Sequence, residues 1–155
     1  MDRCASSLVL SILMLAALTC CAPASAEEAK LTNYAKALAK AKKEGKAVLL
    51  DFTGSDWCHW CQTLNAEVFD TPEFKRWAAN RAVLVEIDFP QTKKLPADLE
   101  KQNAGLSEKF AIEGYPTIIV LTPTGKMLGK MGYQIGGPLK WTKDCDAIIA
   151  TAARK

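Results

Sequence analysis

The chain has 155 residues, of which 49% are hydrophobic and 24% are charged, a balance that fits one compact domain with an ordinary core. Its formal net charge of +3 is too small to indicate a nucleic-acid partner, and the pairs Lys42-Lys43 and Lys93-Lys94 are typical of solvated surface. No repeat, low-complexity tract or Gly/Ser-rich linker divides the sequence.

The first 26 residues have the features of a secretory signal peptide. After a short positive start, residues 8–18 form an apolar run that is too short to span a bilayer as a stable helix. Ala24 and Ala26 then provide the A-x-A spacing that signal peptidase recognises. We expect cleavage after Ala26, export to the periplasm and a mature domain of residues 27–155.

Cys20 and Cys21 leave open a second interpretation, in which one of them is lipidated and anchors the protein to a membrane. A small residue usually stands directly before a lipidated cysteine, whereas Thr19 precedes Cys20 and Cys20 precedes Cys21. We therefore favour a cleaved signal peptide over a lipoprotein signal.

The mature chain begins with a predicted helix and a buried strand. Residues 31–46 predict a helix, with Thr32 or Asn33 as its cap and Gly45 at its end. Residues 47–52 form a continuous apolar run with a single carboxylate, which predicts a strand buried on both faces of a sheet.

The following elements alternate helices with strands. Thr71 and Pro72 suit the start of a helix, as capping hydroxyl and first helical residue. Segment 89–105 is polar, holds two prolines and is long for a connection in so small a domain. We expect helices at 61–69, 71–81, 106–114 and 137–155, and strands at 82–88, 115–121 and 127–133, the last two forming a hairpin around 122–126. This order is that of an α/β layer architecture.

Signal cleavage would leave three cysteines, Cys58, Cys61 and Cys145, which are a poor framework for structural disulfides. A zinc site needs four ligands, and His59 lies inside the Cys58–Cys61 pair, where it cannot readily complete the same tetrahedron. Haem attachment needs a histidine directly after the second cysteine, where Gln62 stands. A purely structural disulfide is a weak alternative, because so short a loop constrains the unfolded chain little.

The position of the C-x-x-C pair favours redox chemistry. The pair follows a buried strand and opens a predicted helix, so the Cys58 sulfur would lie at a helix N-terminus. There the unpaired N–H groups and the helix dipole stabilise a thiolate, which is the attacking species in disulfide exchange. Cys61, one turn further on, would be more buried and would act as the resolving cysteine.

The stretch LLDFTGSDWCHWC, followed downstream by FAIEGYPTIIVLTPTGK, resembles the thioredoxin superfamily, in particular its exported bacterial thioredoxin-like and Dsb-type reductase members. The resemblance covers residues 34–153. It implies an α/β thioredoxin fold, a central mixed β-sheet flanked by helices on both faces, with Cys58 as nucleophile and Cys61 as resolving cysteine. It also implies a cis peptide bond between Tyr115 and Pro116, in a loop that faces the dithiol and binds the substrate backbone.

Two positions depart from the family pattern. The family's buried acid lies six residues before the first cysteine, whereas Asp51 lies seven before Cys58, a difference that one inserted residue would absorb. Asp51 would then help to deprotonate Cys61, or it would point aside and only cap the loop. The lysine that thioredoxins often carry near this acid is replaced by Leu84.

Four further side chains have candidate roles. We expect Trp57 and Trp60 to form the apolar rim of a substrate-facing surface, because both flank an exposed sulfur. His59 lies in the first helical turn, where the dipole disfavours imidazolium, so we expect it to be largely neutral. It either donates to the Cys58 thiolate or projects into water. Cys145 lines up with apolar positions of the last helix, which favours a buried core thiol over a redox partner.

The sequence therefore predicts an exported, monomeric protein-disulfide reductase that needs no metal or organic cofactor. Its substrates would be disulfide-containing exported proteins, and the family implies a membrane-embedded thiol transporter as electron donor. Two alternatives stay open: an oxidase or isomerase using the same dithiol, and a non-catalytic dithiol module that handles copper or binds a partner. We also expect segment 89–105 to border the substrate groove, its alternative being a surface insertion that packs only on its own helix.

Overall fold

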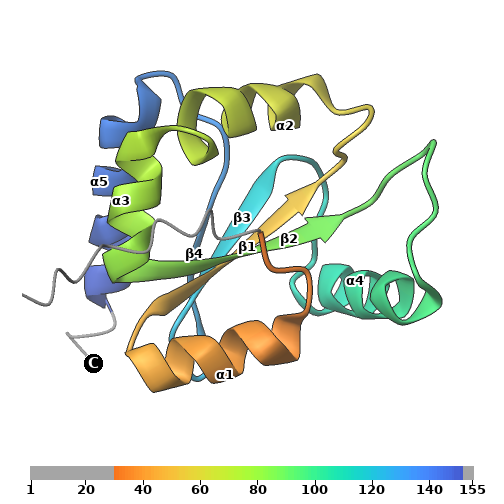
Figure 1. Cartoon of the computed structure of the whole chain (residues 1–155), viewed down its shortest axis with the longest axis horizontal. Coiled ribbons are helices and arrows are strands. Elements are labelled where there is room, and N and C mark those ends of the chain that lie inside the picture. The colour runs from red at the N-terminus through yellow and green to blue at the C-terminus, as the bar shows by residue number, and fades with distance from the viewer. Residues whose placement is uncertain (1–29, 152–155) are drawn as a thin grey trace, which may run out of the picture.

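The computed structural model describes residues 30–151, so the predicted signal peptide and its cleavage site lie outside the described residues. Figure 1 shows one mixed sheet whose strands follow the order β2-β1-β3-β4. The strands are β1 (Ala47–Thr53), β2 (Ala82–Asp88), β3 (Thr117–Leu121) and β4 (Met127–Met131). β1 pairs parallel with β2 and antiparallel with β3, and β3 and β4 form the predicted antiparallel hairpin.

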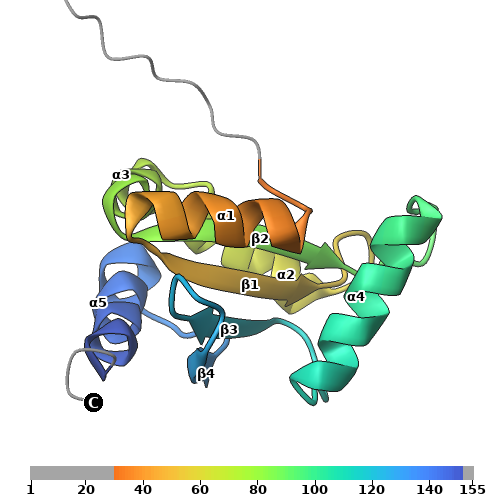
Figure 2. The ribbon, with the colours of Figure 1, turned by 90° about the horizontal axis from the view of Figure 1, so that it is seen from below.

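Helices cover both faces of this sheet (Figures 1 and 2). One face carries α1 (Tyr34–Glu44) and α4 (Ala97–Lys109). The other carries α2 (His59–Leu64), a π-helical turn η1 that continues α2 (Asn65–Phe69), α3 (Pro72–Arg81) and α5 (Gly137–Ile149). The predicted thioredoxin fold is therefore confirmed. No helix within residues 30–151 has both the length and the apolar character needed to cross a membrane.

The core is divided between the two faces by the alternation of side chains along the strands. Val48, Leu50 and Phe52 of β1 pack in the layer formed with α1 and α4. Leu49 packs on the opposite face, in the layer formed with α2, α3 and α5. Every residue of β1 is buried, as the continuous apolar run predicted.

The helix ends follow the local sequence signals. The Asn33 side chain accepts a hydrogen bond from the backbone N–H of Lys36, and Gly45 ends α1 with a left-handed φ of 68°. Thr71 caps α3 by accepting from the backbone N–H of Phe74, directly before the predicted proline at the first helical position.

The prediction for segment 89–105 is wrong in its second half. Residues 97–105 are helical and belong to α4, which runs on to Lys109 in place of a separate helix over 106–114. Acidic side chains in the first turn of α4 suit a helix start. The sequence showed no apolar helical periodicity here, because Asn103 and Leu106 are the buried residues of this polar helix. α4 ends before Ala111, which has a left-handed φ of 48°.

Candidate active site

A short loop connects the end of β1 to Cys58, which caps the N-terminus of α2. The Cys58 Sγ accepts a hydrogen bond from the backbone N–H of Cys61 at 3.2 Å, and the two residues form a disulfide with Cα atoms 5.3 Å apart. Cys58 is 7% exposed and Cys61 is 2% exposed. A thiolate at Cys58 would thus gain a backbone donor and the helix dipole, and it is the more accessible of the two sulfurs.

Asp51 lies on the face of the sheet that α2 covers, because side-chain alternation along β1 puts it on the side of Leu49. It is 2% exposed, and desolvation by burial raises its pKa to about 7. The positive charge of Lys30 opposes this rise, whereas the negative charges of Glu86 and Asp88 add to it. Within residues 30–151, Oδ1 of this carboxyl has no hydrogen-bond partner. Asp51 can therefore change its protonation state near neutral pH.

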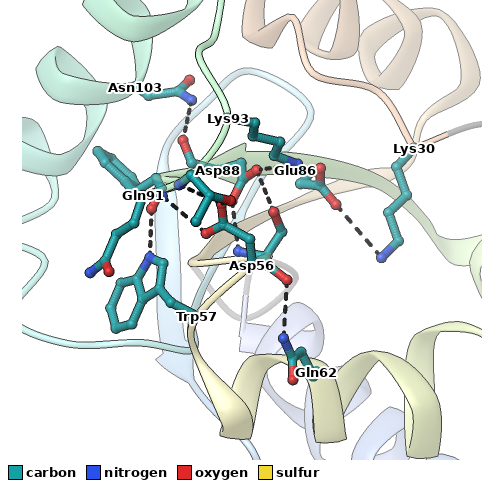
Figure 3. A network of polar contacts seen from close by, with 12 residues as sticks. Lys30, Asp56, Trp57, Gln62, Glu86, Asp88, Gln91, Lys93 and Asn103 are labelled. Carbon is teal, nitrogen blue, oxygen red and sulfur yellow. Dashed lines mark hydrogen bonds and ion pairs between the residues drawn. The ribbon is translucent and has the colours of Figure 1, made fainter.

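The positive charge near Asp51 comes from a residue that the sequence did not point to. Leu84, at the position of the usual family lysine, packs partly buried against the core. Lys30 precedes α1, where the next residue, Leu31, forms a bridge with Val85 of β2. The Lys30 Nζ lies 3.8 Å from the Glu86 carboxylate, and a dashed line marks this ion pair in Figure 3. This contact joins segments far apart in the chain, so no local pattern could have found it.

Trp57, Tyr115 and Phe89 form an aromatic cluster that joins three loops. The Tyr115–Pro116 peptide bond is cis, in the form that the resemblance implied. The Tyr115 ring meets the Trp57 ring edge-on at 5.6 Å between centroids and lies 5.5 Å from the Phe89 ring. The Cys58 loop, the Pro116 loop and the segment after β2 therefore meet beside the dithiol, and Phe89 joins the residues that the sequence singled out.

Trp60 and His59 lie on the exposed side of α2. Trp60 is 56% exposed and stacks on Tyr133 with centroids 5.4 Å apart, while the Tyr133 hydroxyl donates to Glu67 at 2.7 Å. His59 is exposed, and its ring lies 5.4 Å from the Trp60 ring. With Trp57 at 42% exposure, both predicted rim tryptophans are accessible.

Cys145 is the free cysteine of the described chain, and it lies in the core. Burial raises the pKa of its thiol to about 12, which keeps the thiol protonated. The prediction of a buried core thiol is confirmed. Across residues 30–151, no three His, Cys, Asp or Glu side chains cluster in a way that could hold a metal ion.

Comparison with known proteins places this site in a family. The sequence profile described as thioredoxin-like matches residues 29–123. "Disulfide bond reductase DsbH" of Chlamydia pneumoniae is 35% identical over 115 residues, which cover 74% of this chain and 69% of that protein. "Thioredoxin-related protein DsbJ" of the same organism is 30% identical over 100 residues, 64% of this chain and only 29% of that protein. The solved structure titled "DsbH Oxidoreductase" superposes with a TM-score of 0.76 at 29% identity, covering 94% of this chain and 95% of that one.

Proposed function

Because this chain belongs to the thioredoxin-like family and is a Dsb-type thiol-disulfide oxidoreductase with Cys58 and Cys61 as its C-x-x-C pair, we propose that it reduces disulfides in exported proteins. The observation that carries the proposal is the position of Cys58 at the N-cap of α2, with the Cys61 N–H donating to its sulfur. This arrangement stabilises the thiolate form of the more exposed cysteine, which is what an attacking thiol requires.

In the proposed reaction, the Cys58 thiolate attacks one sulfur of a substrate disulfide and the other substrate sulfur leaves as a thiolate. Cys61, as a thiolate, then attacks the Cys58 Sγ of this mixed disulfide and releases the second substrate thiolate. Two electrons pass from the dithiol to the substrate, so the protein ends in the disulfide form that joins Cys58 to Cys61.

We assign Asp51 the role of accepting the Cys61 proton before the second attack. It lies on the sheet face that α2 covers, and α2 carries Cys61. A buried carboxyl with a pKa of about 7 exchanges a proton readily at neutral pH, which is the property expected of such a base.

The reducing direction is supported by the similarity to a protein named disulfide bond reductase and by His59. The histidine directly follows the nucleophile, whereas strong oxidases of the family that this chain resembles carry a histidine directly before the resolving cysteine, where Trp60 stands here. We therefore expect the dithiol to have a reduction potential nearer the thioredoxin value of about −270 mV than the strong-oxidase value of about −120 mV. Equilibration with glutathione measures this potential, and insulin reduction measures the activity. A potential above about −180 mV would instead assign the protein to oxidation or isomerisation.

We further propose that residues 1–26 direct export and that a membrane thiol transporter supplies the electrons. The apolar run and the A-x-A spacing support the first part, and the family resemblance supports the second. N-terminal sequencing of the protein from a periplasmic fraction should begin at Glu27. A lipid-modified N-terminus at Cys20 or Cys21 would establish the lipoprotein alternative.

A further inference from the structure

The Cys58 loop and the segment after β2 hold each other through two carboxylates, as Figure 3 shows. Asp88, at the end of β2, accepts hydrogen bonds from the backbone N–H and the hydroxyl of Ser55 at 2.8 and 2.7 Å. In the other direction, Asp56 accepts from the backbone N–H groups of Gln91 and Thr92 at 3.0 and 2.8 Å. We call this pair of reciprocal contacts the clasp.

The two halves of the clasp differ in exposure. Asp88 is 4% exposed, and the Lys93 Nζ lies 3.0 Å from its carboxylate. Its backbone carbonyl accepts from the buried side-chain amide of Asn103, which ties the clasp to α4. Asp56 is more exposed than Asp88. Hydrogen bonds to its carboxylate, of which the one from the Thr92 hydroxyl has the largest effect, hold the pKa of this carboxyl below its usual range. Asp56 therefore stays ionised and keeps both oxygens available as acceptors throughout the neutral pH range.

Trp57 contacts the segment after β2 that the clasp holds. The Trp57 indole N–H donates to the backbone carbonyl of Phe89 at 2.8 Å, directly before the turn that Asp56 holds. The indole also lies against Gly54, since a Cβ at that position would be only 2.3 Å from Cε2 of the ring. Together with the edge-on contact to Tyr115, these neighbours contact the indole of Trp57 from three segments, although the residue is 42% exposed.

We propose that Asp56 is a positioning residue for disulfide exchange: by holding residues 91–92 it fixes the Phe89 carbonyl and hence Trp57 as one wall of the surface that binds a polypeptide disulfide. Asp56 itself touches no reacting atom. A fixed wall lowers the entropy lost when an extended substrate segment docks between Trp57 and the Pro116 loop. A small disulfide makes few contacts outside the two sulfurs, so it gains much less from this wall. The clasp thereby favours polypeptide disulfides over small ones, whichever way the electrons flow.

The first experiment compares the Asp56→Ala variant with the wild-type protein, both in the reduced form. The two disulfide substrates are insulin and oxidised glutathione. We expect the ratio of kcat/KM for insulin to that for glutathione to fall about tenfold, mainly through a higher KM for insulin. Thr92→Val removes only the hydroxyl bond and should give a smaller fall. The control is Glu73→Ala on α3, which breaks an exposed contact with Arg76 and should leave the ratio unchanged. An unchanged ratio in Asp56→Ala overturns the proposal.

The second experiment asks whether the clasp acts through Trp57. Gly54→Ala displaces the indole without touching either carboxylate, so it should reproduce the fall in the ratio. If both changes act on the same ring, the insulin-to-glutathione ratio of the double variant should be less than about twofold below that of the more affected single variant. If the two decreases in this ratio multiply in the double variant, the proposed action of the clasp through Trp57 is overturned. The proposed function is tested separately, by measuring whether the wild-type protein reduces insulin. The ratios test only the clasp, because all the variants share the same dithiol.

Discussion

Replacing Asp51 by asparagine should remove most of the dependence of the free energy of unfolding on pH between pH 5 and pH 8. Burial raises the pKa of Asp51 from 3.8 to about 7 in the folded protein. Between these two values the folded state binds a proton that the unfolded state has released. Its contribution therefore favours folding at low pH, and stability is lost as the pH rises from about 4 to about 7.

The size of the effect follows from the gap between the two pKa values. A gap of about three units, at about 1.4 kcal/mol per unit, destabilises the folded protein by about 4 kcal/mol above pH 7 relative to pH 3. About 3 kcal/mol of this loss should fall between pH 5 and pH 8. The loss is a large fraction of the total stability of an ordinary domain, so it is measurable.

The assay is urea unfolding of the disulfide form at several pH values, for wild type and Asp51→Asn. The asparagine amide brings its own cost, because the site offers Oδ1 no partner within residues 30–151. That cost is independent of pH, so the difference in slope isolates the Asp51 titration. Equal slopes in the two proteins would refute the argument that burial makes Asp51 titrate near pH 7.

Two further predictions concern the cysteines. Cys58 should alkylate first, and Cys61→Ser should accumulate mixed disulfides with substrates and with the electron donor, whereas Cys58→Ser should accumulate none; equal trapping by both variants would contradict the assignment of roles. Cys145 should resist alkylation in the native protein and react only after unfolding, because it is fully buried with a thiol pKa of about 12. Cys145→Ala should keep the reduction potential of the dithiol while lowering stability by about 1 kcal/mol through the cavity it leaves, and a changed potential would give Cys145 a redox role.

The dithiol could be located from the sequence because strand, cysteines and helix follow one another without interruption. The apolar run of β1 and the helix signals around Cys61 predict a sulfur at a helix N-terminus from local rules alone. The face on which Asp51 lies also follows from strand alternation. Its electrostatic surroundings do not, because Lys30 reaches Glu86 only through a bridge between segments far apart in the chain.

The clasp could be predicted from the sequence only in part. Parallel pairing of β1 with β2 sets Thr53 opposite Asp88, so the loops that follow these strands must start side by side. This much was predictable, and it brings the first half of segment 89–105 to the edge of the sheet where Cys58 lies. The hydrogen bonds to Asp56 were not predictable, because their donors are backbone N–H groups whose directions depend on the turn at 91–93. Strand register thus places the two loops together, and the carboxylates of Asp88 and Asp56 hold them in contact.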